Sequence, residues 1–399
     1  MTVTMNLRAR LHGVPIAAAA ATCLLSFVAF WAAQRAANVT MLDLSVYRAE
    51  GETVLAGGDL YAMRATSANL PTTYPPFAAL LFTPLTLVGV PEMRTLATAG
   101  NLLLVLALVH LSLRLVGRDR PGAALWVAAV LVWCEPVWTT LRYGQINLLI
   151  AVAVLWDLTR REDNRWAGVG IGLATAVKLT PGLFVVLLLI VGVARARAYG
   201  WNAWLRQAVT ATGVFLTVTV ASAVVLPYDS RRFWTEMIFE TSRVGRKEET
   251  ANQSLNGVLA RLLHTTDPGV WWVLAAAVVA VAGMTVAVLA ALRDDLPVAV
   301  VACATTALLV SPISWSHHWV WCVPMLILLA TRVGPVWTAG TALVFGSFAL
   351  WWVPHAPAPV RLELDQNGWQ MLLSGLYTLV GLGLLAGAGV KLWRTSRTA

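Results

Sequence analysis

The sequence predicts an all-α polytopic membrane protein, and three observations lead to this fold class. Of the 399 residues, 58% are hydrophobic and 12% are charged, whereas about a quarter of the residues in a typical soluble domain are charged. Apolar runs of about 20 residues recur along the chain, and a helix of that length crosses a hydrocarbon core of ~30 Å. The short alternating segments of a transmembrane β-barrel are missing from the sequence. We therefore expect residues 1–399 to form a single integral membrane domain.

The apolar runs predict about twelve spanning helices. We expect them near residues 14–34, 95–116, 121–139, 145–159, 166–178, 181–194, 207–226, 270–292, 296–312, 317–332, 335–353 and 368–390. A further apolar piece at 76–90 is short and flanked by prolines. We expect it to be re-entrant or interfacial, although it could also span.

The first run follows Arg8 and Arg10 and could be a signal peptide. It is long and lacks a small-x-small cleavage site before the next loop, so an uncleaved first span is favoured. Arginines gather at alternate ends of the spans, which by the positive-inside rule puts both termini in the cytoplasm. The two long loops at 35–75 and 227–269, and most polar clusters with them, then fall on the outer or periplasmic face of the cell membrane.

The net charge of +9 fits this topology and an attraction to anionic membrane lipids. The sequence has no contiguous basic segment, so we expect no nucleic-acid partner. The 19 tryptophans suit anchoring at the membrane interfaces, and such rings could also stack on sugars.

Asp43, in the first outer loop shortly after the first predicted span, is the main candidate for chemistry. An ionisable residue at membrane level is costly and is a functional candidate by default. One interpretation is a helix cap, in which Asp43 accepts backbone N–H bonds from a helix that begins near Leu44. The other is a general base, because an ionised carboxylate can accept the proton of an attacking hydroxyl. The two interpretations are compatible.

Four basic residues are candidates for binding a phosphate group. Lys178 is either a lysine that reaches from an interface to water or a point-charge ligand for phosphate. Arg142 could also bind a phosphate, or it could anchor the chain at the membrane interface. His317 and His318 are adjacent, and on a helix neighbouring side chains point about 100° apart, so one of them is expected to face the site. That histidine could hydrogen-bond or protonate a leaving phosphate; the alternative is two interfacial histidines in an aromatic belt.

Amide and aromatic side chains could hold sugars. Amides donate and accept hydrogen bonds, as sugar hydroxyls do, although loop capping and turn formation explain each amide taken alone. The candidates for sugar or acceptor binding are Tyr74, Tyr143, Gln145, Asn147, Asn252, Gln253, Trp315 and Trp319.

We expect no metal and no cofactor. The four cysteines lie far apart within apolar runs, and the adjacent histidines lack the i, i+4 spacing typical of a helical zinc site. A P-loop is missing, which argues against an ATPase, and so is a GxSxG elbow.

The motifs together resemble a known family. The chain is similar to the actinobacterial polyprenyl-phosphate-mannose-dependent α-(1→2)-mannosyltransferases, glycosyltransferase family 87, which have the GT-C membrane fold, and it looks most like the phosphatidylinositol mannoside branch. The resemblance runs from about Asp43 to Met325 and is weak after Gly334. It rests on Asp43-Leu44-x-Val46-Tyr47, Thr73-Tyr74-Pro75-Pro76-Phe77-Ala78-Ala79, Glu135-Pro136-Val137, Tyr143-Gly144-Gln145-Ile146-Asn147, Val177-Lys178-Leu179-Thr180-Pro181, Asn252-Gln253-Ser254 and Leu309-x-Ser311-Pro312-Ile313-Ser314-Trp315-Ser316-His317-His318-Trp319-Val320-Trp321.

The resemblance implies an inverting mannosyltransferase that takes mannose from a β-linked polyprenyl phosphate and makes an α linkage. Asp43 corresponds to the catalytic aspartate of the family's first loop and would deprotonate the acceptor 2-hydroxyl as it attacks C1. Preorganised cations would stabilise the leaving phosphate. That phosphate leaves as a monoester, with less charge than a nucleoside diphosphate, so a metal-free mechanism is expected.

Several alternatives stay open at this point. The sugar could be arabinose or glucose on the corresponding lipid phosphate, and the acceptor could be a phosphatidylinositol mannoside, lipomannan or lipoarabinomannan. A lipid flippase or transporter is a different class, which would need polar residues through the midplane of the membrane.

Overall fold

The computed structural model describes residues 16–356 and 359–396. Apart from one two-stranded hairpin, every regular element in these residues is a helix, which confirms the predicted all-α class. Arg8 and Arg10, which were part of the topology prediction, lie outside the described residues.

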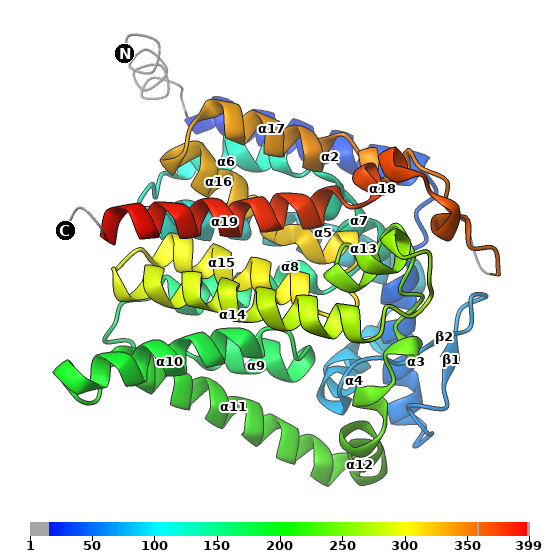
Figure 1. Ribbon diagram of the computed structural model, residues 1–399. Coiled ribbons are helices and arrows are strands. Elements are labelled where there is room, and N and C mark those ends of the chain that lie inside the picture. Colours follow the sequence, from blue (N-terminus) through cyan, green and yellow to red (C-terminus); the bar gives the residue numbers. More distant parts are fainter. Residues whose placement is uncertain (1–15, 357–358, 397–399) are drawn as a thin grey trace.

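The long helices form a bundle in which they run beside one another (Figure 1). In the described part of the chain, six helices are long and apolar enough to cross a membrane, or seven if the pair α6 (Pro121–Leu131) and α7 (Glu135–Tyr143), bent by 78°, counts as one span. The six are α2 (Ile16–Ala36), α5 (Val90–Leu115), α10 (Gly182–Tyr199), α11 (Ala203–Val225), α14 (Val270–Leu292) and α19 (Leu376–Ser396). The chain is therefore a multi-pass membrane protein.

The predicted number of twelve spans is not confirmed, because several apolar runs form shorter helices than expected. These are α8 (Asn147–Leu158), α9 (Val169–Val177), α15 (Leu296–Val310), α16 (Cys322–Arg332) and α17 (Pro335–Gly346). The run at 76–90 divides into α4 (Pro76–Phe82) and the 3₁₀ helix η1 (Thr83–Leu87). Proline contributes to these breaks, because it starts helices well and cannot continue them.

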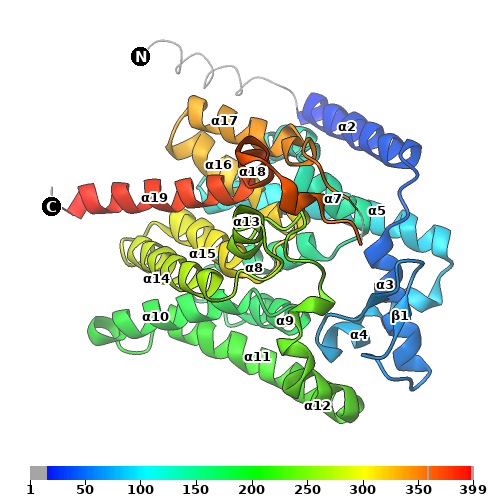
Figure 2. The same cartoon turned by 45° about the vertical axis from the view of Figure 1, so that its right-hand side comes forward.

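The two long loops contain short elements that gather at one end of the bundle, on the right in Figure 1 and nearer the viewer in Figure 2. The first loop holds α3 (Leu42–Leu55) and the strands β1 (Arg64–Ala65) and β2 (Leu70–Pro71), which pair antiparallel with Arg64 opposite Pro71. The second loop holds α12 (Pro227–Thr235), η2 (Met237–Phe239), η3 (Thr241–Arg243) and α13 (Leu255–Leu262). Further along the chain are η4 (Ser316–Trp321), η5 (Ala349–Trp351), η6 (Leu362–Asp365) and α18 (Gly368–Ser374).

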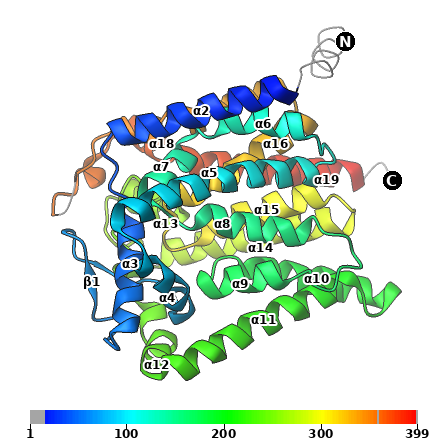
Figure 3. The ribbon, with the colours of Figure 1, turned by 180° about the vertical axis from the view of Figure 1, so that it is seen from behind.

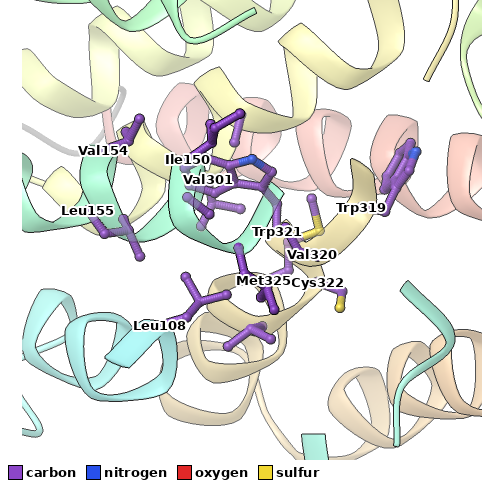
Figure 4. Close-up of a cluster of buried hydrophobic side chains, with 14 of the residues drawn as sticks. Leu108, Ile150, Val154, Leu155, Val301, Trp319, Val320, Trp321, Cys322 and Met325 are labelled. Atoms are coloured by element: carbon purple, nitrogen blue, oxygen red, sulfur yellow. The ribbon is translucent and has the colours of Figure 1, made fainter. Parts of the chain in front are cut away.

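Helix α2 begins, and helix α19 ends, at the opposite end of the bundle from the loop elements (Figures 1 and 3). The described chain thus enters and leaves the bundle at the same end. The core between the helices is apolar and tightly filled: Figure 4 shows part of it, where side chains of α5, α8 and α15 meet Val320, Trp321 and Met325.

Candidate active site

A cavity of about 480 Å³ lies among the loop elements, and residues from segments far apart in the sequence line it. The first loop contributes Asp43, the end of α7 contributes Tyr143, and Lys178 comes from the turn between α9 and α10. The second loop and the segment around η4 form other parts of the wall. Its volume is that of a small-molecule site.

Asp43 lies in the first turn of α3 and does not cap it. The helix begins at Leu42, its N-cap is Met41, and no side chain makes a cap hydrogen bond there. Instead, Oδ2 of Asp43 accepts a hydrogen bond of 2.6 Å from Nε2 of Gln145. The capping interpretation is therefore wrong, and the carboxylate faces the cavity that it lines.

Two tyrosines fix the orientation of the Gln145 amide. Its Oε1 accepts hydrogen bonds from the hydroxyls of Tyr47, at 2.7 Å, and Tyr74, at 3.2 Å. The two hydroxyls are also 3.0 Å apart. With Oε1 facing two donors, Nε2 must point to Asp43, so the carboxylate has one orienting donor and its Oδ1 has no donor among the described residues.

The surroundings of Asp43 also change its ionisation. Burial raises the pKa of its carboxyl to about 6, although the hydrogen bond from Gln145 and the charge of Lys178 act in the opposite direction. A carboxylate with this pKa is ionised near neutral pH and is a stronger base than an ordinary aspartate.

Lys178 lines the same cavity as Asp43 and brings a positive charge to it. Its Nζ donates to Oδ1 of Asn147 at 3.1 Å and lies 3.0 Å from Nε2 of His318. It has no carboxylate within salt-bridge distance among the described residues, and burial lowers its pKa to about 7 while Asp43 opposes this shift. An ammonium held by neutral groups is open to an anionic ligand.

Both predicted histidines line the cavity, although only one was expected to. They lie in a 3₁₀ segment and not in an α-helix, so the angle between neighbouring side chains that the prediction assumed does not apply. His318 contacts Lys178, whereas Nε2 of the nearly buried His317 has no hydrogen-bond partner within residues 16–356 and 359–396. Burial and the Lys178 charge lower the pKa of both imidazoles, so His318 can accept a hydrogen bond from the lysine.

Trp315 and Tyr143, which the sequence suggested for sugar contacts, both line the cavity. The Trp315 ring packs on the backbone of Gly245 in the second loop, where a Cβ would lie 2.6 Å from Cζ2 of Trp315. The Tyr143 ring contacts His317 edge to face at 5.4 Å. Gln145 and Tyr74 also line the cavity, whereas Asn147 lies behind Lys178 and holds it in place.

The structure corrects the prediction for three residues, Asn252, Gln253 and Trp319, none of which has exposed surface with which to contact a sugar. Oδ1 of Asn252 accepts from the backbone N–H of Ser314, Gln253 donates to backbone carbonyls, and Trp319 packs against α19. The side chains of Asn252 and Gln253 therefore join loop segments to one another, because a buried amide must be paired. Arg142 is exposed and is not among the residues that line the cavity.

Sequence reasoning missed several residues around the cavity. Tyr47 lies one helical turn from Asp43, and the i, i+4 spacing could have revealed it. Glu240, Arg243 and Glu249 line the wall that the second loop forms, and no local signal indicates them. Glu50, on the same helix as Asp43, is fully buried, and burial raises the pKa of its carboxyl to about 8.

A second, narrow cavity of about 40 Å³ meets the first one at Lys178 and His318, which line both. Apart from its polar end, side chains of α8, α10 and α15 surround it, among them Ile150, Phe184 and Ala307. We call this cavity the apolar slot. In residues 16–356 and 359–396, no group of three or more His, Cys, Asp or Glu side chains is placed to hold a metal ion.

The fold and the cavity define a multi-pass membrane protein whose polar site lies at one end of its helices. The chain belongs to glycosyltransferase family 87, whose sequence model matches residues 73–312. This confirms the resemblance drawn from the motifs.

Relatives of known activity cover most of the chain. It is 33% identical over 369 residues to the polyprenol-phosphate-mannose-dependent α-(1-2)-phosphatidylinositol mannoside mannosyltransferase of Mycolicibacterium smegmatis, covering 84% of this chain and 80% of the relative. It is 32% identical over 372 residues to the corresponding phosphatidylinositol pentamannoside mannosyltransferase of Mycobacterium tuberculosis, covering 90% and 76%. Among solved structures, ArnT from Cupriavidus metallidurans bound to undecaprenyl phosphate is similar with a TM-score of 0.41 and 16% identity, over 92% of this chain and 76% of that one.

Proposed function

We propose that this protein transfers mannose from polyprenyl-phosphate-mannose to the 2-hydroxyl of a mannosylated lipid, a phosphatidylinositol mannoside or a related lipoglycan, and forms an α-(1→2) linkage. Membership of family 87 and the activities for which its relatives are named support this reaction. The observation that carries the proposal is that one cavity is lined by a carboxylate, Asp43, and by Lys178, a lysine that has no carboxylate partner in the described part of the chain.

In this reaction the 2-hydroxyl oxygen of the acceptor attacks C1 of the mannose, and the bond from C1 to the phosphate oxygen breaks. Asp43 takes the hydroxyl proton, and polyprenyl phosphate leaves with the electron pair of the broken bond. A single displacement inverts C1, so a β-linked donor gives an α-linked product. One base is enough because no covalent intermediate forms.

The Lys178 ammonium is proposed to bind the phosphate of the donor. It would stabilise the charge that grows as the C1–O bond breaks, and such preorganised charge is usually the largest catalytic contribution. His318 and Asn147 hold its Nζ at 3.0 and 3.1 Å, which fixes the ammonium before the substrate arrives. His317 lines the same wall. With these groups supplying the positive charge and donors, we propose that the reaction needs no metal and no cofactor.

The sugar rings are proposed to lie in the large cavity, against Trp315 and near Tyr74, Tyr143 and Gln145, which line it. The donor lipid is proposed to run from Lys178 towards the apolar slot, because the phosphate position is where the polar and apolar cavities meet. We further propose that the cavity opens at the outer face of the cell membrane and that both termini are cytoplasmic, in agreement with the arginine-rich chain ends.

The test is mannose transfer by the purified full-length protein and its Asp43→Asn variant, with polyprenyl-phosphate-mannose as donor. The variant is expected to lose about 10²- to 10⁴-fold in kcat, the usual contribution of a general base. Glu52→Gln, an exposed change on the same helix, is the matched control and is expected to keep normal activity.

Two outcomes of this experiment would overturn the proposal. Near-normal turnover by Asp43→Asn would exclude Asp43 as the base. Faster transfer from the corresponding arabinose or glucose donors than from the mannose donor would assign a different sugar.

A further inference from the structure

Glu135 is a fully buried acid at the first position of α7, and the proposed mechanism does not use it. Its carboxylate accepts four hydrogen bonds. Thr139, one turn further along α7, donates to Oε1 at 2.7 Å. Ser316 and Trp351 donate to the same oxygen at 2.8 and 3.1 Å, and the hydroxyl of Tyr377 donates to Oε2 at 2.8 Å.

Three of these four donors come from other elements of the fold. Ser316 starts η4, Trp351 ends η5 and Tyr377 lies in α19. Ser316 and Trp351 also line the large cavity. A buried carboxylate with this many donors is fully paired, and the loss of one member leaves its partners unpaired in a water-poor place. Glu135 therefore joins three segments at the back of the cavity wall.

The contact with Ser316 leads directly to the histidines. His317 follows Ser316, and its backbone carbonyl accepts hydrogen bonds from Thr140 at 2.9 Å and from Asn147 at 3.2 Å. Helix α7 thus holds this segment twice, through Glu135 and through Thr140. His318 comes next and contacts Lys178, so a displacement of the segment would move the histidine away from the lysine.

The contact with Tyr377 extends the network to the second loop. The backbone N–H of Tyr377 donates to Oε1 of Gln253 at 3.2 Å, and Nε2 of Gln253 donates to the carbonyl of Thr250 at 2.7 Å. Tyr377 and Trp351 lie outside residues 73–312, which carry the family match. The C-terminal part of the chain therefore reaches the cavity through the same carboxylate.

We propose that Glu135 is a positioning residue that holds the segment 314–318, and with it His318, against Lys178, and that Tyr377 anchors Glu135 from the C-terminal helix. This inference rests on the proposed function, because the segment is assigned there to the donor phosphate. Glu135 contacts no substrate in this scheme and acts through Ser316.

The experiment compares four variants of the full-length protein. Tyr377→Phe removes one hydroxyl that does not line the cavity, and Glu135→Ala removes the carboxylate. Thr139→Val is the matched control, because it removes a bond of similar length to the same carboxylate within one helix. Glu135→Gln, which keeps Oε1 as an acceptor for Ser316, provides a conservative rescue if Glu135→Ala does not fold.

The expected kinetic result is a change in the shape of the pH profile of kcat/KM. Glu135→Ala is expected to lower kcat by about 10- to 100-fold, and Tyr377→Phe by about fivefold, the value of one net hydrogen bond. In both, the alkaline limb is expected to move to lower pH, because the Lys178 ammonium loses the hydrogen bond to His318 that favours its charged form. Thr139→Val is expected to leave the limb unchanged, and Glu135→Gln is expected to restore most of the rate lost in Glu135→Ala.

A role in stability alone would lower the amount of active protein and leave the shape of the profile unchanged. An unshifted limb in both Glu135→Ala and Tyr377→Phe, or equal damage by Thr139→Val and Tyr377→Phe, would overturn the proposal.

Hydrogen exchange of the backbone amides at 311–321 tests the same idea without substrate. We expect faster exchange there in Tyr377→Phe than in Thr139→Val. If the wild-type protein transfers no mannose, the proposed function fails, and the exchange result still decides on the positioning role. Unchanged exchange at 311–321 in Tyr377→Phe would overturn it.

Discussion

At the scale of single residues, the site depends on two ionisable groups of opposite charge, and their surroundings bring their pKa values close together. Burial raises that of Asp43 to about 6 and lowers that of Lys178 to about 7. The base needs Asp43 deprotonated and the phosphate site needs Lys178 protonated. Both conditions hold only between these two values, since Asp43 is neutral below the first and Lys178 is neutral above the second.

The first prediction is therefore a bell-shaped pH dependence of kcat/KM. The rate is expected to rise as the pH passes about 6 and to fall above about 7. In Lys178→Arg the alkaline limb is expected to disappear, because a guanidinium stays charged at these pH values. Initial rates across the range measure this, with Lys247→Arg, a lysine paired to Asp267 outside the cavity, as control. An alkaline limb that persists in Lys178→Arg would belong to another group.

A second prediction at this scale concerns metals. Dialysis against a chelator is expected to change the rate by less than about twofold, because protein cations and donors, and not a Lewis acid, stabilise the leaving phosphate. The assay compares chelated protein with and without added Mg²⁺ or Mn²⁺. Loss of activity that either ion restores would contradict the metal-free scheme.

At the scale of elements, the contact between α3 and the end of α7 positions the base. Gly144 ends α7 with a φ of 68°, and a Cβ there would lie 2.6 Å from Cβ of Leu44 on α3. The next residue is Gln145, which orients Asp43. The close approach of the two helices is thus what brings the amide within reach of the carboxylate.

Gly144→Ala is expected to destabilise the protein and to lower kcat. The positive φ costs about 1 kcal/mol for a non-glycine residue, and the clash with α3 adds about 1–3 kcal/mol. Gly117→Ala is the matched control, because Gly117 has a φ of 71° with open space around it, so only the backbone cost applies. Thermal unfolding and turnover measure the difference. Equal effects of the two changes would show that α3 adapts freely.

At the scale of the whole molecule, the packing of distant segments creates the junction between the polar cavity and the apolar slot. The slot is lined from α8, α10 and α15, and its polar end is Lys178 and His318. In the proposed reaction the donor phosphate would lie at this junction, and the slot, at about 40 Å³, has room only for the first atoms of the lipid chain.

Filling the slot is expected to impair donor binding. Ala307→Leu adds volume to its wall and is expected to raise KM for polyprenyl-phosphate-mannose about tenfold, with KM for the acceptor unchanged, because the larger side chain takes up the little space that the slot offers to the donor. Ala282→Leu, on the exposed face of α14, is the control for added apolar volume. An unchanged donor KM in Ala307→Leu would place the lipid elsewhere.

Much of the candidate site could be predicted from short motifs. Asp43, Lys178 and the histidine pair were identified because each is a polar group in an apolar sequence, where such groups are costly. The same reasoning selected Asn252 and Gln253, which are fully buried. An amide that binds a sugar and an amide that pairs with a distant backbone look alike in sequence, since both are polar residues near a loop.

The sequence by itself determined the membrane class and the family, because hydropathy and motifs are properties of neighbouring residues. Only the tertiary structure decided which polar groups face the cavity, that Asp43 is held by Gln145 and does not cap α3, and that Glu135 joins η4 to the C-terminal helix. The reason is physical: the partner of a buried polar group comes from whichever segment packs against it, and that segment can lie more than 200 residues away, as the contact of Glu135 with Tyr377 does.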